Sequence, residues 1–494
     1  MISEYLNMLF QKIVCIVLML PPVVHLNAQQ EIKKPNVLFI AIDDMNDWTT
    51  LFDKDNPIKT PNIERLAERG VFFNHAYCTS AACNPSRAAI MTGISPYNTG
   101  VYGNHDAWRK LVPDAITFPR YFMQNGYSAK GSGKIFHHGE AGLDNPDRPS
   151  FEEFFDMLPT RAPKQNYNGY RSGNLSKVWF DWGEHDQKMI DIDAVEYAEK
   201  VMEEKTDKPL ILGVGIFKPH LPFYAPKETF KKYPFNKTKI PPFKDNDLDD
   251  VPEIGKNMAL KEEFIYTNTS SQPEDSHGSL KKMVQCYQAS ADFADQMVGR
   301  LLDKLDETGM SENTIIVLYA DHGYHLGDKQ SCVKFTLWEK ANHVPFIIAV
   351  PQMANAGKVC EQPVSLLDIY PTLLELCGLE PSKEVDGKSL VPLLENVNTN
   401  WEQPALMTMG RGNHAVRSKR WRYIRYSDGS EELYDHKNDP WEWNNLATDS
   451  KYKSVIAEHK KWLPAHEVPW LIDESQNWIY RRVEWNDVPV NEKK

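Results

Sequence analysis

The sequence lacks the features that mark several classes of protein. Its 494 residues contain no heptad pattern, no long low-complexity tract and no repeat of fixed period, which argues against a coiled coil, a disordered chain and a solenoid. It also lacks an excess of positive charge. The formal net charge is −12 and no segment forms a basic domain, so no nucleic-acid partner is expected. An acidic surface repels anionic polymers, so a site for an anionic substrate must gather its own cations.

Long apolar runs are lacking too, and one short run lies near the N-terminus. It spans residues 13–20, follows Lys12 and leads to the small residue Ala28. This run is too short to cross a membrane, and Cys15 within it lacks the small residues expected before a lipidated cysteine. We therefore predict a signal peptide over residues 1–28, no stable membrane anchor, and export to a periplasm or to the outside of the cell.

Cysteine is sparse, with seven residues in the whole chain. Loss of Cys15 with the signal peptide leaves six, which an exported protein could pair in three disulfides. Their spacing is irregular, and a chain of this length has enough core to be stable without them. Cys78 and Cys83 are close enough in sequence to pair, so a disulfide between them stays open.

Continuous apolar runs indicate strands that are buried on both faces. Helical patterns separate these runs, and such alternation is typical of a doubly wound α/β fold with a parallel or mixed central sheet. The predicted strands are 36–42, 210–215, 314–319 and 346–350, and the predicted helices are 63–69, 86–92, 194–204 and 280–305.

The pattern changes near residue 385, where shorter alternating segments begin. Segments such as 421–426 and 432–434 predict a small antiparallel sheet with a terminal helix. We place a boundary near residue 400, between a catalytic α/β domain (35–400) and a smaller α+β subdomain (401–494). Within the first domain, the proline-rich segment 218–260 is interpreted as surface loops over one end of the sheet.

Acidic residues directly follow two of the predicted strands. They are Asp43-Asp44 and Asp321, the latter followed by His322. Ligands collect at the carboxyl ends of strands in such sheets, and adjacent carboxylates repel each other unless a cation lies between them. Either pair alone would also fit a helix cap or a solvated turn. Together, three carboxylates and a histidine predict a site for Ca²⁺ or Mg²⁺.

Residues 83–93 read Cys-Asn-Pro-Ser-Arg-Ala-Ala-Ile-Met-Thr-Gly. This segment resembles the signature of the type I sulfatases, in which the cysteine is oxidised to formylglycine. The resemblance implies an alkaline-phosphatase-like fold and conversion of Cys83 by a formylglycine-generating or an anaerobic sulfatase-maturating enzyme. One hydroxyl of the aldehyde hydrate would attack sulfur and the other would later expel sulfate, while a metal lowers the pKa of the attacking hydroxyl. Arg87 lies one helical turn after Cys83 and could hold that hydroxyl.

Three further segments extend the resemblance. Residues 133–137 look like the Gly-Lys-x-x-His segment of the family, in which Lys134 would bind a sulfate oxygen and His137 would assist the hydrate. Residues 218–223 resemble a segment of the iduronate-2-sulfatase branch, in which His220 would protonate the leaving oxygen. Lys334 falls where that branch has a lysine that binds sulfate and substrate. The metal ligands implied by the resemblance are Asp43, Asp44, Cys83, Asp321 and His322.

The similarity covers residues 35 to 450, with departures on what should be the substrate side. This chain has Cys332 where the branch has an aromatic residue, and Asp328-Lys329 where it has Glu-His. Residues 433–440 also resemble the family, in a structural segment. The resemblance therefore implies a sulfuric ester hydrolase for a sulfated carbohydrate, a uronate 2-O-sulfate or another glycan sulfate. The sugar and the choice between exo and endo action stay open.

Two other functions remain open at this point. A phosphomonoester or phosphonate hydrolase could share the fold and the formylglycine. A non-catalytic protein that binds sulfated glycans could carry an unconverted Cys83. Assays of sulfate against phosphate esters, and the mass of the peptide around residue 83, distinguish these alternatives.

Overall fold

An eight-stranded mixed sheet forms the centre of the computed structural model, which describes residues 34–137, 147–156, 181–271, 273–276 and 278–470. The strand order is β10-β2-β9-β8-β1-β6-β3-β4. The strands are β1 (Asn36–Asp43), β2 (Val71–Tyr77), β3 (Ser128–Gly133), β4 (Glu153–Phe155), β6 (Leu210–Pro219), β8 (Thr314–Ala320), β9 (Phe346–Ala349) and β10 (Lys358–Ser365).

The central strand β1 runs parallel to both of its neighbours. Ile40 lies opposite Val214 of β6 on one side and Leu318 of β8 on the other. Strand β9 runs antiparallel to β8 and β2, which makes the sheet mixed, as predicted. All ten residues of β6 are buried, because helices cover both faces of the sheet. Gly213 allows this packing, since a Cβ there would lie 2.3 Å from the Phe39 ring.

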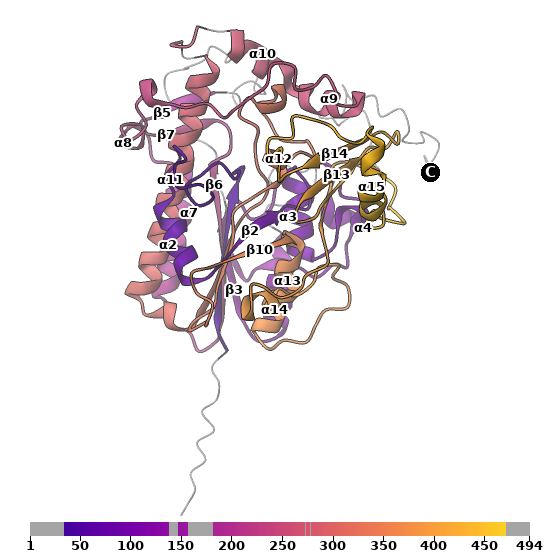
Figure 1. The fold of residues 1–494 in the computed structure, drawn as a ribbon. Coiled ribbons are helices and arrows are strands. Elements are labelled where there is room, and N and C mark those ends of the chain that lie inside the picture. The colour runs from indigo at the N-terminus through magenta and orange to yellow at the C-terminus, as the bar shows by residue number, and fades with distance from the viewer. Residues whose placement is uncertain (1–33, 138–146, 157–180, 272, 277, 471–494) are drawn as a thin grey trace, which may run out of the picture. The chain divides into compact units, whose positions relative to one another are not determined.

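Helices pack on both faces of the sheet (Figure 1). The first face carries α2 (Pro61–Arg69), α7 (Ile190–Glu203) and α11 (Leu280–Glu307), and the second carries α3 (Cys83–Thr92), α6 (Phe118–Gln124) and α13 (Ile369–Leu376). The predicted helices and strands are therefore confirmed, with ends that differ by a few residues. Shorter helices are α4 (Pro96–Thr99), α5 (Trp108–Leu111), α10 (Glu263–Ser271), α12 (Glu339–Asn342) and α14 (Val391–Glu395).

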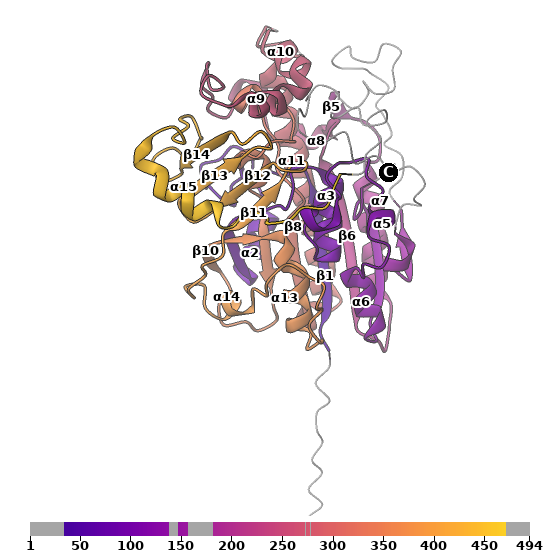
Figure 2. The same cartoon turned by 90° about the vertical axis from the view of Figure 1, so that its right-hand side faces the viewer.

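The C-terminal part forms a second, antiparallel sheet in the order β11-β12-β13-β14 (Figure 2). Its strands are β11 (Ala405–Thr408), β12 (His414–Arg417), β13 (Trp421–Arg425) and β14 (Glu431–Asp435). Helix α15 (Lys453–Lys460) packs Ile456 against Tyr423 and Leu433 of this sheet. The small C-terminal sheet with its terminal helix was predicted from the alternating pattern. The domain boundary near residue 400 stays a prediction, since Pro35–Lys494 forms one unit by itself.

The interpretation of 218–260 as surface loops is wrong for its first part. Strand β6 continues through the buried Lys218 to Pro219, and β7 (Phe223–Pro226) pairs with β5 (Trp182–His185). The helices α8 (Lys227–Phe230) and α9 (Glu253–Ala259) follow. Proline is tolerated here because these strands end or lie in a two-stranded edge.

The predicted signal peptide lies outside the described residues. Within the described part of the chain, no helix has the length and apolar character needed to cross a membrane.

Candidate active site

Asp43 and Asp44 mark the carboxyl end of β1, where β8 ends beside it. Both side chains are buried. Asp44 has a φ of 63°, a left-handed conformation that Asp adopts more readily than most residues. Its backbone N–H donates to Oδ1 of Asp321 at 3.2 Å. The two strand ends are thus joined directly, and three carboxylates meet at one point, as the sequence predicted.

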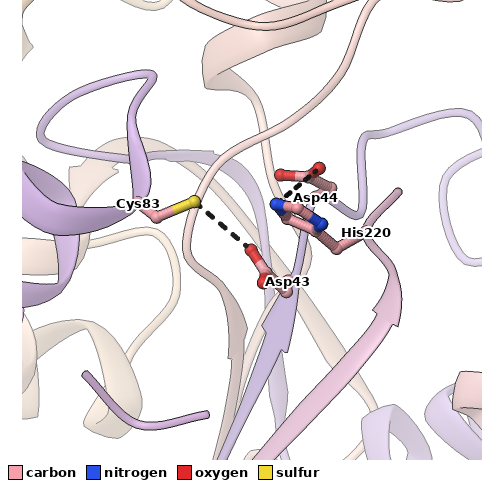
Figure 3. Close-up of side chains that lie close together, drawn as sticks. All are labelled: Asp43, Asp44, Cys83 and His220. Atoms are coloured by element: carbon pink, nitrogen blue, oxygen red, sulfur yellow. Dashed lines mark hydrogen bonds and ion pairs between the residues drawn. The ribbon is translucent and has the colours of Figure 1, made fainter. Parts of the chain in front are cut away.

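Cys83 begins helix α3 and points toward this strand end (Figure 3). Its Sγ lies 3.1 Å from Nζ of Lys334, 3.3 Å from Nε2 of His322, and 3.7 Å from both Oδ1 of Asp43 and Nζ of Lys134. Burial would raise the pKa of the thiol, but the charges of Lys134, Lys334 and His322 hold it well below its usual value. The structure therefore favours an anionic group at this position.

No disulfide involves Cys83 in this structure. The six cysteines of the described residues form no disulfide, and all are buried. The neighbouring candidate, Cys78, has its Sγ 3.5 Å from Oδ1 of Asn342 instead. The pairing of Cys78 with Cys83 that the sequence left open is thus not formed.

Arg87 links the carboxylates to the loop that carries Lys134. Its Nε donates to Oδ2 of Asp321 at 2.8 Å, and its Nη2 lies 3.5 Å from Oδ1 of Asp43. Its Nη1 donates to the carbonyls of Lys134 and Ile135. Its Nη2 is buried without a hydrogen bond among the described residues, and no hydrogen bond joins the guanidinium to Cys83 Sγ there.

Two lysines each pair with a different carboxylate of the site. Lys134 Nζ contacts Oδ2 of Asp43, and Lys334 Nζ lies 2.7 Å from Oδ1 of Asp44. Burial would lower the pKa of Lys334, but Asp44 and Cys83 raise it above its ordinary value. Both lysines also contact the sulfur of Cys83, so both can hold an anion bound beside it.

Three histidines lie near Cys83 and Asp44, and each has a different environment. His322 is buried, and Asp321 outweighs burial to raise its pKa to about 9. His137 borders Cys83, and burial lowers its pKa to about 4, which keeps it neutral. His220 is partly exposed, with Nε2 3.9 Å from Oδ2 of Asp44, and its Nδ1 bonds the carbonyl of Leu221. Figure 3 shows the His220 ring beside the carboxylate of Asp44.

The donor set fits a hard divalent metal. Side-chain donor atoms of Asp43, Asp44, Cys83 and His220 lie within 4.8 Å of one another, as do those of Asp43, Cys83, Asp321 and His322. Burial raises the pKa of Asp321 to about 7 with help from the charge of Asp43, whose own pKa the neighbouring Lys134 lowers. Oδ2 of Asp44 is buried without a hydrogen bond in the described residues. A cation bound here would relieve this repulsion.

Comparison with known proteins gives matches over most of the chain. The family model described as Sulfatase matches residues 35–379, and a model for the N-sulphoglucosamine sulphohydrolase C-terminal region matches residues 327–468. The chain belongs to the sulfatase family. The predicted sulfuric ester hydrolase activity and family resemblance are thereby confirmed.

Relatives of this sulfatase include bacterial and mammalian enzymes. A sulfatase of Formosa agariphila is 37% identical over 92% of this chain and 90% of its own length. Iduronate 2-sulfatase of Homo sapiens is 29% identical over 70% and 69%, respectively. Two solved structures, a phosphonate monoester hydrolase of Agrobacterium radiobacter and a 2-O GAG sulfatase, each have a TM-score of 0.68 and 22% identity, covering 87% of this chain and 94% and 91% of theirs. These structures show that the fold is shared.

One residue of this sulfatase site escaped the sequence reasoning. Lys218 is 1% exposed, and its Nζ donates to the carbonyls of His220, at 3.0 Å, and of Pro222. Burial lowers its pKa to about 8, although Asp191 opposes that effect. The lysine therefore ties down the backbone that carries His220. Its place two residues before His220 was the available signal, but a lysine near prolines also fits a solvated loop.

The residues expected on the substrate side are buried in the sulfatase. Lys329 is 2% exposed and its Nζ lies 2.8 Å from Oδ1 of Asp247. Asp328 bonds His325, and Cys332 is buried. Each of these three side chains is engaged with a partner or with the core. Their place on the substrate side stays a prediction.

Proposed function

We propose that this sulfatase is an exported enzyme that hydrolyses sulfate esters of a sulfated carbohydrate, with a formylglycine derived from Cys83 and a divalent metal, Ca²⁺ or Mg²⁺. The observation that carries the proposal is the position of the Cys83 sulfur, where two lysines, a histidine and a carboxylate meet. A cysteine with only a structural role would not require these charged neighbours.

The sulfur of Cys83 stands in for the group that the converted residue would present. The formylglycine hydrate supplies an oxygen nucleophile for sulfur, and the metal supplies positive charge toward that oxygen and the sulfate. Asp43, Asp44, Asp321 and His322 would hold the metal. A maturating enzyme of either of the two kinds named above is the partner that this chemistry requires.

The cations of the site give the sulfate group its place. Lys134 and Lys334 contact the sulfur of Cys83 and so lie within reach of oxygens on an ester that meets residue 83. Arg87 fixes Asp43 and Asp321 in their positions. Charge that develops on sulfate oxygens during the reaction is stabilised by these fixed groups, which need no rearrangement.

His137 and His220 are suited to different proton transfers. His137 is neutral and next to Cys83, so it can accept a hydrogen bond from a hydroxyl of the hydrate. His220 lies on the open side of the site, where the alcohol half of the ester would leave. Its Nε2 lies 3.9 Å from Oδ2 of Asp44, and an imidazole nitrogen in that position could donate a proton to the leaving oxygen.

The carbohydrate part of the proposal is supported by the named relatives, which include iduronate 2-sulfatase. The test has two parts, both on enzyme from the native host. The mass of the peptide that spans residue 83 should show formylglycine, and hydrolysis of sulfated mono- and disaccharides should exceed that of matched phosphate esters. An unmodified thiol would defeat the catalytic proposal, and a large preference for phosphate would defeat the choice of substrate.

A further inference from the structure

A second charged pocket lies apart from the groups around Cys83. It has a volume of about 490 Å³ and lies between α12, the end of β2, the turn after β12 and the segment that follows β14. None of the residues that line it is among those placed at Cys83. The two regions are close in sequence, since Asp47 of the pocket comes three residues after Asp44. Figure 1 shows α12 beside β13 and β14.

The lining of this pocket has more positive than negative charge. It includes five lysines and arginines but two carboxylates, Asp47 and Glu339. Both carboxylates are already paired: Asp47 with Lys340 at 2.8 Å and Glu339 with Arg417 at 3.1 Å. The inner wall is therefore neutral, and the excess charge lies at the rim.

The rim carries two lysines with nothing to neutralise them. Arg420 is paired with Asp435 at 2.7 Å, but Lys419 and Lys437 are exposed and form no ion pair within the described part of the chain. A positive field also reaches the histidine in the wall. The pKa of His75 is lowered first by burial and then by the charge of Arg417. An anion entering the pocket would meet both rim lysines.

An aromatic side chain completes the pocket. Trp441 is partly exposed and lines it, and its ring is fixed by Lys340, whose Nζ lies 4.5 Å from the ring centroid, and by Trp443, whose ring stacks at 6.5 Å. A fixed tryptophan offers a flat apolar face with a polar edge. Beside two free ammonium groups, such a face suits the ring of a charged sugar better than a small inorganic anion.

We propose that this pocket binds a sulfated or carboxylated sugar residue of the carbohydrate, at a distance from the ester that is cleaved. The inference rests on the proposed function, since it takes an anionic carbohydrate as substrate. The chain as a whole carries a charge of −12, so a local cationic pocket would help to hold a polymer that the rest of the surface repels.

Kinetics on the full-length, converted enzyme test the pocket. The double variant Lys419→Ala/Lys437→Ala removes the rim charges. The control Lys205→Ala/Lys358→Ala makes the same change in charge at two exposed lysines outside the pocket lining, one between α7 and β6 and one at the start of β10. We expect the rim variant to raise KM for ι-carrageenan or heparin about fivefold to tenfold, and to leave turnover of 4-nitrophenyl sulfate unchanged. An equal KM in both double variants would overturn the proposal, as would an equal loss on 4-nitrophenyl sulfate.

Binding without turnover separates this inference from the proposed function. Protein with Cys83→Ala should be retarded in gels that contain heparin, and the rim substitutions or Trp441→Ala added to it should reduce the retardation. If the enzyme cleaved no sulfated carbohydrate but this difference persisted, the proposed function would fail and the pocket would stand. Loss of the difference, or displacement of heparin by inorganic sulfate as effectively as by a sulfated disaccharide, would overturn the sugar assignment.

Discussion

At the scale of single residues, the site is a balance of buried charges around Cys83. Lys134, Lys334 and Arg87 face Asp43, Asp44 and Asp321, with each cation within 4 Å of a carboxylate. A buried charge that loses its closest partner is strongly destabilising, and each of these six charges has its closest partner among the other five, not in Cys83 or His220. A loss of activity on substitution of Cys83 or His220 can therefore be attributed to catalysis. A loss on substitution of the lysines could equally come from lost stability.

Cys83→Ala should abolish turnover and leave the fold intact. It removes the precursor of the nucleophile but no member of the ion pairs, so we expect at least about a thousandfold loss of kcat with Tm changed by a few degrees at most. Hydrolysis assays and thermal unfolding measure the two effects. Cys78→Ala is the matched control, since it truncates a buried cysteine outside the donor set and should keep its activity. Residual activity in Cys83→Ala would exclude the formylglycine mechanism.

His220→Ala should harm sugar sulfates more than aryl sulfates. An alkoxide leaving group needs a proton, whereas a nitrophenolate does not, so we expect about a 10²–10⁴-fold loss of kcat on sugars and a much smaller one on 4-nitrophenyl sulfate. Comparing kcat on the two substrates gives the result. Equal losses would remove His220 from the acid role and leave it a binding residue.

The motifs predicted which of these residues lie together, but they did not predict the residues that hold them in place. Cys83, Lys134, His220 and Lys334 were identified because each lies in a short segment of characteristic spacing. Lys218 could not be identified in that way, because its function depends on burial against two carbonyls, which sequence does not display.

At the scale of elements, the site exists because parallel strands end at one edge. Residues 36–42 and 314–319 are predictable as strands from their apolar runs, yet nothing in the sequence says that they are neighbours. Pairing of β1 with β8 joins segments 278 residues apart, as in Asn36 opposite Thr314, and depends on packing of the whole sheet. The segment after Pro219 was misjudged for a related reason, since β7 is stabilised by β5 and not by its own pattern.

Removal of the metal should act through these strand ends. Three carboxylates would be left with lysine and arginine partners alone, so we expect a chelator to abolish activity and to lower Tm by several degrees. Activity and unfolding should be measured after adding back Ca²⁺ and Mg²⁺ separately. Full activity in the dialysed, metal-free protein, verified by elemental analysis, would contradict the metal site.

A second element, the segment after α15, braces the helix that begins with Cys83. Nε1 of Trp470 donates to Oδ2 of Asp106 at 3.2 Å, and the carbonyl of Asp106 accepts from Nδ2 of Asn84 at 2.8 Å. Val468 adds a backbone bond to the carbonyl of Tyr97 at 2.8 Å. The C-terminal segment is thus connected to Asn84, the residue next to Cys83.

Trp470→Ala should weaken this brace. We expect a loss of about 1–2 kcal/mol in the free energy of unfolding and a severalfold lower kcat, because Asp106, whose carbonyl accepts from Asn84, loses one of the contacts that hold it in place. Trp462→Ala is the control, since Trp462 is 43% exposed and should be silent in both measurements. Denaturant unfolding and initial rates would decide, and similar behaviour of the two variants would mean that the brace has no effect on the site.

At the scale of the whole molecule, stability comes from the core and not from cross-links. The cysteines of the described residues are all buried, and none forms a disulfide. This outcome fits the length of the chain, which the sequence argument had used to treat disulfides as unnecessary. The absence of a disulfide between Cys78 and Cys83 could not be predicted, because five residues of separation permit one.

Reductant should therefore leave the stability of the mature protein unchanged. Loss of even one disulfide would cost about 2–5 kcal/mol and shift Tm visibly. Unfolding scans with and without reductant measure this directly. Thiol titration in denaturant counts the remaining cysteines. With Cys83 converted, five of the six described cysteines should react. A lower Tm on reduction would contradict the structure, and six thiols would contradict the conversion.

The complete burial of Cys83 also has a consequence in time. The side chains that enclose it include Lys334, which is synthesised 251 residues later. At about 5–20 residues per second, roughly 12–50 seconds separate the two on the ribosome, and during that interval the enclosure cannot form. Under the proposed conversion, a maturating enzyme would have access to Cys83 in that period and would lose it when β8 pairs with β1. The order of segments along the chain would thus set the time available for the modification, and slow folding would favour complete conversion.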